Sequence, residues 1–466
     1  MRKTLLGLCV LSALAAPAYA ANHPVPPQTE AQRIAALEAK VQALETELES
    51  MKAGGVAVQP APATPGVSDA GTSAESEIDS LSSSPVEAAR SESASVAAPA
   101  GDTSGGSNPN VFNPAISIIL NGSYSHHSLD PTTYARAGFP LVGGAGPSAN
   151  GFSLGESEMA FATNIDDKFY GQVTLSINTD AGQDRLGVEE AYIDTTALPN
   201  GFSLRAGRFL SNIGYLNGHH THTDNFFDRP LPYQAFLGGQ YGDDGVQLRW
   251  VAPTALFVEL GGEVFRGQSF PSGGAQKGGL GTRTAFAHIG GNAGSNSEWL
   301  AGVSVLKTKA APADDGFSGD TTLYVADGTW KWAPQGNFKD GGVTLRSEVF
   351  LDDRNGVYAD PANPSLTSLW NGQRRGAYLE GVYRLNRTWD LGYRYDKLWS
   401  GGGNPFTPAQ GSFDPYRHTA ELTWRNSEFS LVRLQLSHDK PNPFDTDNAV
   451  TVQYQTSLGA HGAHKF

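Results

Sequence analysis

Cysteine, long apolar runs and positive charge are all scarce in this chain. Of its 466 residues only Cys9 is a cysteine, which excludes an internal disulfide and a cysteine-ligated metal cluster. No run of about 18 apolar residues occurs, so a helical membrane bundle is excluded. The 33 Lys and Arg are outnumbered by 47 Asp and Glu, and the net charge of −14 argues against a nucleic-acid partner. Glycine is abundant, with 55 residues, which favours tight turns and strands over helices.

The beginning of the chain predicts export. Arg2 and Lys3 precede an apolar run from residue 5 to residue 15, and Ala18-Tyr19-Ala20 is a cleavage signal. Residues 1–20 are therefore predicted to be a secretory signal peptide. Cys9 lies inside it, so the mature chain has no thiol.

Residues 21–52 form an N-terminal segment that contains a predicted coiled coil at 31–52. Its apolar residues follow the 3-4 spacing of a coiled-coil seam: Ile34, Leu37, Val41, Leu44, Leu48 and Met51. An amphipathic helix packed on its own domain is the alternative, and the seam residues do not decide between two and three strands. Residues 53–110, rich in Ala, Ser, Gly and Pro, are predicted to be a disordered linker.

Residues 111–466 alternate apolar and polar side chains and predict an all-β transmembrane barrel. Sixteen antiparallel strands are expected near 115–125, 152–165, 169–178, 186–197, 202–209, 244–252, 255–265, 282–290, 297–306, 320–333, 341–352, 375–385, 388–398, 416–425, 428–437 and 449–466. A soluble sandwich would alternate too. However, short turns alternate with long connections at 126–151, 210–243, 266–281, 353–374, 399–415 and 438–448, which is typical of outer-membrane barrels.

Aromatic residues near the short turns indicate a girdle at a lipid interface: Tyr170, Trp250, Trp332, Trp389 and Trp424. The terminal Phe466 resembles the last residue of bacterial outer-membrane proteins. We therefore expect a barrel in outer-membrane lipid, with the coiled coil and linker in the periplasm.

A barrel of this size leaves an aqueous lumen. Its predicted lumen-facing charges are Glu156, Glu158, Glu189, Arg205, Arg249, Arg346, Glu348, Arg394, Glu421 and Arg433. Acidic residues outnumber basic ones in this segment, which favours cations over anions. No nucleophile with an adjacent base and no cofactor motif accompanies the carboxylates, so we do not expect an enzyme.

Histidines in the longest loop are the most specific chemical feature. The loop contains His219, His220, His222 and Asp224, and in an extended chain the last three would project to one side. Imidazole and carboxylate at this spacing suit Zn²⁺ as ligand or substrate. His126 and His127 begin another long loop on the same rim and could complete the metal site. The alternative is a polar loop that is merely rich in histidine.

Four segments resemble a proteobacterial family labelled zinc-regulated TonB-dependent outer-membrane receptors. They are residues 113–117, Gly207-Arg208-Phe209, residues 214–217 and residues 236–247. The resemblance implies a link to zinc, with His219, His220 and His222 as the matching loop histidines. The coiled coil followed by a barrel is more distantly similar to phosphate-selective and sugar-specific trimeric porins. TonB-dependent transporters have a plug and about 22 strands, which this chain cannot hold.

Two functions are consistent with these features. The first is an unplugged porin-like channel, a homotrimer through barrel and coiled coil, that passes small solutes or helps divalent metal cross the membrane. The second is a surface metal receptor whose barrel mainly anchors histidine-bearing loops.

Overall fold

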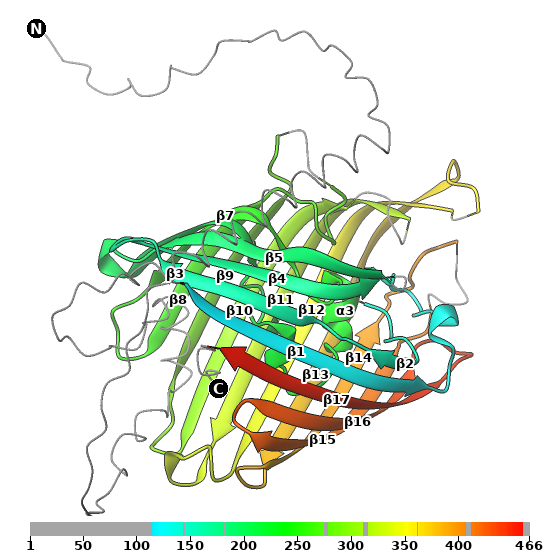
Figure 1. The fold of residues 1–466 in the computed structure, drawn as a ribbon. Coiled ribbons are helices and arrows are strands. Elements are labelled where there is room, and N and C mark those ends of the chain that lie inside the picture. The colour runs from blue at the N-terminus through cyan, green and yellow to red at the C-terminus, as the bar shows by residue number, and fades with distance from the viewer. Residues whose placement is uncertain are drawn as a thin grey trace, which may run out of the picture. The chain divides into compact units, whose positions relative to one another are not determined.

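The computed structural model describes residues 114–142, 145–180, 183–274, 278–310, 316–360, 362–406 and 412–459 (Figure 1). The predicted signal peptide, coiled coil, linker and terminal Phe466 lie outside these residues and stay predictions. The strands are β1 (Ala115–His127), β2 (Gly151–Ser153), β3 (Ser157–Asn164), β4 (Phe169–Asp180), β5 (Gln183–Thr195), β6 (Phe202–Leu210), β7 (Gly242–Val251), β8 (Phe257–Phe265), β9 (Thr282–Asn292), β10 (Ser297–Ala310), β11 (Phe317–Trp332), β12 (Gly342–Ala359), β13 (Thr367–Arg384), β14 (Trp389–Trp399), β15 (Tyr416–Ser427), β16 (Ser430–Lys440) and β17 (Asp447–Gly459).

Short helices lie in the connections. The 3₁₀ helices are η1 (Pro131–Thr133), η2 (Pro199–Gly201), η3 (Leu216–Gly218), η4 (Thr221–Thr223) and η5 (Pro334–Gly336), and the α-helix is α3 (Leu231–Leu237). Among the described residues, no helix has the length and apolar character needed to cross a membrane.

The strands form one closed antiparallel sheet. Each strand pairs with its neighbours in sequence, and β1 pairs with β17 from Ser117↔Gly459 to His127↔Ala449. The short strands β2 and β3 both pair with β1, beside Ser123–Ser125 and Ala115–Ile119 respectively. They are two pieces of one interrupted stave, so the seventeen strands make a barrel of sixteen staves, as predicted.

Side chains alternate between the outside and the inside of the barrel. On β17, Val450, Val452 and Tyr454 are exposed, whereas Thr451 and Gln453 are buried. The same pattern holds around the ring, where the exposed large side chains are mostly Leu, Val, Ile, Tyr and Trp and the buried faces carry many polar and charged residues. Of the predicted lumen-facing charges, Glu158, Arg249, Arg346, Glu348, Arg394, Glu421 and Arg433 are buried inside the ring. A polar interior behind an apolar exterior is the pattern of a lipid-embedded barrel.

The predicted aromatic girdle is correct in part. Trp389 and Trp424 are exposed and stack at 6.3 Å between ring centroids. Tyr170 was wrongly assigned to the girdle, because its exposed fraction is only 6% and its hydroxyl donates to Gln172 inside the barrel. In a strand the side chains alternate, so Tyr170 shares the inward face of Gln172 and Thr174.

The two rims differ in their connections. We call the rim with residues 128–150, 211–241 and 266–281 the loop rim, and the rim with 165–168, 252–256 and 385–388 the turn rim. The predicted long connection at 353–374 is wrong, since β12 and β13 extend through most of it and only 360–366 connects them. Its charges belong to the wall: Arg354 and Arg374 both contact the buried carboxylate of Asp352, at 3.0 and 2.9 Å. These charged residues had been read as loop.

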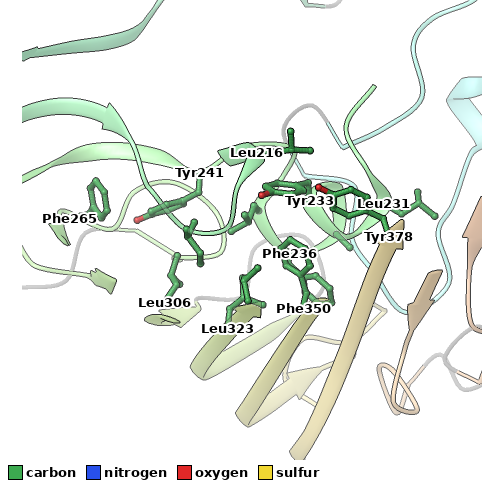
Figure 2. Close-up of a cluster of buried hydrophobic side chains, with 14 of the residues drawn as sticks. Leu216, Leu231, Tyr233, Phe236, Tyr241, Phe265, Leu306, Leu323, Phe350 and Tyr378 are labelled. Atoms are coloured by element: carbon green, nitrogen blue, oxygen red, sulfur yellow. The ribbon is translucent and has the colours of Figure 1, made fainter. Parts of the chain in front are cut away.

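An apolar cluster occupies part of the interior, where the sequence predicted only water. Tyr233, Phe236 and Leu216 of the connection 211–241 pack against wall residues such as Phe350 and Leu323 (Figure 2). Because the connection folds inward, its own apolar side chains provide a core that the wall strands cannot provide alone.

Candidate functional site

Residues 211–241 cross the interior of the barrel, and we call them the constriction segment. Asn212 N–H donates to Glu263 of β8 at 3.0 Å, and Gly214 N–H donates to Ser304 of β10 at 2.9 Å. Near the middle of the segment Phe227 N–H donates to Gln435 of β16 at 2.9 Å. Figure 1 shows α3, which belongs to this segment, enclosed by the strands. Wall side chains thus satisfy backbone groups that would otherwise be buried without partners.

Helix α3 is fastened by a buried tyrosine–carboxylate network. The hydroxyl of Tyr233 donates to Glu348 of β12 at 2.9 Å, and the hydroxyl of Tyr378 of β13 donates to the same carboxylate at 2.7 Å. Phe236 packs edge-on against Phe139 and stacks on Phe350, with centroids 5.6 and 5.9 Å apart. The helix is therefore fixed both by hydrogen bonds and by apolar contacts.

One side of the segment faces the arginine wall, which we define as Arg394 of β14, Arg417 of β15 and Arg433 of β16. Asp228 contacts Arg394 at 3.0 Å and Arg417 at 2.6 Å. Arg433 donates to the backbone oxygen of Asp224 at 2.9 Å. Every cation of this wall therefore has an anion or a carbonyl oxygen of the constriction segment as a partner.

Two aspartates of the segment respond differently to this environment. Burial raises the pKa of Asp224 to about 6, although Arg229 lies 2.7 Å away and opposes the rise. Burial also acts to raise the pKa of Asp228, but Arg417 and Arg394 outweigh it and hold the pKa below its usual value. Asp228 therefore stays charged, while Asp224 takes up a proton in mildly acidic solution.

Another part of the segment faces the acidic wall, which we define as Glu156, Glu158, Glu189 and Glu190. In the pairing of β4 with β5, Thr174 faces Glu190 and Leu175 faces Val188, so Glu189 is an extra, bulged residue. A bulge can re-aim a side chain that would otherwise point outward. As a result Glu189 and Glu190, although consecutive, both contact His220, at 3.4 and 3.1 Å.

The acidic wall is irregular on its other stave as well. Glu156 lies in the break between β2 and β3 and accepts a hydrogen bond from Thr221 at 2.6 Å. Glu158 follows on β3 and is buried. The break and the bulge thus bring four carboxylates to one part of the interior.

Two of the predicted histidines meet this wall. His220 Nδ1 lies 3.2 Å from Glu158, and His222 Nδ1 lies 2.9 Å from the other oxygen of the same carboxylate. One ligand atom from each of these three residues lies within 4.8 Å of the other two. Burial alone would lower the pKa of His220, but Glu158, with Glu189 and Glu190, raises it well above its usual value. Two imidazoles and several carboxylates can hold either protons or a borderline divalent cation.

The structure separates the other predicted metal ligands from this cluster. His219 bonds through Nδ1 to the backbone oxygen of Tyr215 at 2.8 Å and stacks on its ring. Asp224 pairs with Arg229 on the arginine side. Residues 221–223 form the helix η4 rather than an extended chain, so Asp224 does not follow His220 and His222 to the same side.

His126 and His127 also lie elsewhere. His126 is exposed, whereas His127 contacts Asp447 at 2.6 Å and Ser148 at 3.1 Å. Neither residue is among the groups of the described chain whose ligand atoms converge. Metal binding by any of these residues stays a prediction.

Sequence reasoning named the carboxylates of the acidic wall but did not join them to the histidines. Glu156, Glu158 and Glu189 were expected only to face the lumen, and Glu190 was not singled out. The consecutive pair Glu189-Glu190 in an alternating strand was the available signal, since two adjacent carboxylates cannot both face inward without a bulge.

Comparisons with known proteins give one relative in sequence and several in structure. A scan of known protein families finds no match. An uncharacterized protein of Aquifex aeolicus (strain VF5) is 28% identical over 393 residues, which cover 76% of this chain and 80% of that protein.

Solved structures of similar topology are outer-membrane proteins. The channel DcaP of Acinetobacter baumannii is 14% identical, with a TM-score of 0.49 over 74% of this chain and 97% of that one. The anion-selective porin from Comamonas acidovorans is 10% identical, with a TM-score of 0.47 over 74% of this chain and 99% of that one. The porin-like fold of the present chain is established by its own strand pairing and ring closure.

Proposed function

We propose that this chain is a porin-like channel of a bacterial outer membrane in which the constriction segment decides what crosses. Three features support the proposal: the closed wall, the apolar exterior and the polar interior. Within that interior the constriction segment contacts both the acidic wall and the arginine wall. Any solute that crosses must therefore pass charged side chains at close range.

We further propose that the acidic wall binds a divalent metal ion of the zinc class as it crosses. The observation that carries this step is the convergence of Glu158, His220 and His222, whose ligand atoms lie within 4.8 Å of one another. Their direct contacts would be exchanged for contacts to the ion, with Glu189 and Glu190 close enough to His220 to add carboxylate oxygens. Nitrogen and oxygen donors in this mixture suit Zn²⁺.

The test combines zinc titration with planar-bilayer recording on the purified protein in detergent. His220→Ala with His222→Ala should weaken zinc binding at the acidic wall by at least about 100-fold, because even outer-shell changes cost about 10–100-fold. It should also abolish any effect of zinc on the reversal potential. His219→Ala is the matched control, since His219 faces Tyr215 instead. Unchanged zinc binding in the double variant would refute the metal site and leave the channel proposal to the conductance data.

A receptor is the second candidate, and the dense packing of the interior favours it. Around the constriction segment, Glu348 and Arg394 have exposed fractions of 0% and 1%. A barrel packed this tightly could bind metal without conducting. Stable ohmic steps in the bilayer support the channel, whereas electrical silence together with tight zinc binding supports the receptor.

The assembly and topology follow from the sequence features. We propose a homotrimer held by the barrel and by the coiled coil at 31–52, with that segment in the periplasm. Mass measurement of the detergent complex, with and without residues 21–110, tests both contributions. A monomer in both preparations would refute the trimer.

A further inference from the structure

A second histidine–carboxylate group lies across four neighbouring strands, away from the acidic wall. In the strand register, Glu259 of β8 is opposite His288 of β9, His288 is opposite Gly302 of β10, and Gly302 is opposite Asp327 of β11. Residues directly opposite in an antiparallel sheet present their side chains on the same face. These four residues therefore form one inward-facing row.

Gly302 allows the side chains of His288 and Asp327 to approach each other closely in the middle of this row. A Cβ placed on Gly302 would collide with Oδ2 of Asp327 and with Cδ2 of His288. The two side chains thus lean over the glycine from either side. The backbone of Gly302 does not adopt a positive φ, so the close approach of these two side chains, and not the backbone conformation, requires glycine here.

Asp327 is a buried carboxylate whose hydrogen-bonding capacity is unused. Its exposed fraction is 8%, and neither of its oxygens has a hydrogen-bond partner among the described residues. A carboxylate buried without hydrogen bonds is costly, so it either takes a proton or binds a cation. Across Gly302, the side chain that faces Asp327 is that of His288.

Glu259 orients the histidine for such a cation. Its carboxylate contacts Nδ1 of His288 at 2.9 Å. The ring edge that faces Gly302 carries Cδ2, and Nε2 is the ring nitrogen next to that carbon. In metal sites a histidine typically donates one ring N–H to a carboxylate and binds the metal through its other nitrogen. In this row Glu259 would be the carboxylate that orients the ring, His288 the ligating histidine, and Asp327 the second ligand.

We propose that His288 and Asp327, whose side chains approach each other across Gly302, bind a divalent metal ion of the zinc class between them. This second site uses no residue of the acidic wall, so it goes beyond the proposed function. Gly302 is one inward-facing position closer to the turn rim than Ser304, which accepts the N–H of Gly214 in the constriction segment. An ion that has passed the segment toward the turn rim would meet His288 and Asp327 next.

The experiment counts bound metal in the full-length protein. Zn²⁺ is titrated calorimetrically and Co²⁺ spectroscopically into the wild type, which should take up two equivalents per chain. In the background of His220→Ala with His222→Ala, one equivalent should remain. Asp327→Asn added to that background should weaken the remaining site at least tenfold.

Two glycine variants separate a metal site from a merely structural carboxylate. Gly302→Ala should also weaken the second equivalent at least tenfold, because its methyl group would collide with the side chains of His288 and Asp327 and displace both ligands. Gly328→Ala is the matched control, since a Cβ there meets nothing within 4 Å and lies one residue from Asp327. Migration of unboiled samples on a gel reports whether each variant folds, and His288→Gln replaces Asp327→Asn if the latter does not.

The outcomes separate this proposal from the first one. The second site is refuted if the remaining equivalent of metal still binds with wild-type affinity after Asp327→Asn and after Gly302→Ala. The second site is also refuted if the background variant binds no metal. In that case the single equivalent bound by the wild type belongs to the acidic wall. If only the variants at His288, Gly302 and Asp327 reduce binding, the second site stands and the metal proposal for the acidic wall fails.

Discussion

The two walls that face the constriction segment differ in how their charges are matched. On the arginine wall, Arg394 and Arg417 share Asp228, and Arg433 takes a backbone oxygen of the segment. Buried cations paired in this way hold the segment in place, because removal of one partner leaves an uncompensated charge. On the acidic wall, four carboxylates meet only two histidines of the segment, so acceptor oxygens are in excess. The comparison indicates that the arginine wall anchors the segment and that the acidic wall is free to serve a ligand.

The largest expected effect is on the arginine wall. Asp228→Asn removes the carboxylate that contacts Arg394 at 3.0 Å and Arg417 at 2.6 Å. We expect the free energy that holds the segment in place to fall by about 3–5 kcal/mol. The loss should appear as a lower thermal midpoint in detergent and as a larger single-channel conductance. Asp340→Asn is the control, because its pair with Arg387 is exposed and contributes little to stability. Equal effects of the two variants would contradict the anchoring role.

A smaller effect is expected on the acidic wall, and on a different measurement. Glu189→Gln keeps the size of the side chain but removes the charge of the bulged residue near His220. Zinc affinity should fall by about 10–100-fold, as for other residues that support a ligating histidine. The thermal midpoint without metal should stay close to that of the wild type. Glu421→Gln, inside the barrel near Arg433, is the control and should leave zinc affinity unchanged. If Glu189→Gln lowers stability but not zinc affinity, the division of roles between the walls is wrong.

The smallest effect is expected at Asp224, measured at pH 5. Burial raises the pKa of Asp224 to about 6, so at pH 5 its carboxyl is largely protonated. Because the pKa is raised, the folded protein holds this proton more tightly than the unfolded chain does, and protonation of Asp224 stabilises the fold. This contribution to the free energy of unfolding is lost as the pH rises through about 6. Asp224→Asn should therefore change the free energy of unfolding at pH 5 by less than about 1 kcal/mol, and the thermal midpoint should shift little. A loss as large as that of Asp228→Asn at the same pH would show that Asp224 is charged and anchors the segment equally.

The wall of the barrel could be predicted from the sequence in most of its detail. Alternation is a property of neighbouring residues, so Val452 and Gln453 were assigned to opposite faces correctly. Where a prediction failed, a local rule had been set aside. Tyr170 has the parity of the inward residue Gln172, and its aromatic ring was given more weight than its position. Arg354 and Arg374 fall in the predicted connection 353–374, although their pairing with Asp352 shows that they belong to the interior.

The proposed metal cluster could be predicted only in part. His220 and His222 were chosen for their spacing, but their partners come from strands that lie far away in the sequence. His222 meets Glu158 across 64 residues, and His220 meets Glu190 across 30 residues. Spacing alone also favoured Asp224, which the helix η4 and Arg229 direct to the other side. Neither contact could be derived without knowing that the segment folds inward.

The sequence by itself determined the closed wall and the face that each strand side chain takes, because a period of two residues is a local property of the chain. The tertiary structure alone decided the path of the constriction segment, the carboxylates that meet His220, and the close approach of His288 and Asp327. These depend on ring closure and on the register between strands, which bring together residues that no local pattern connects.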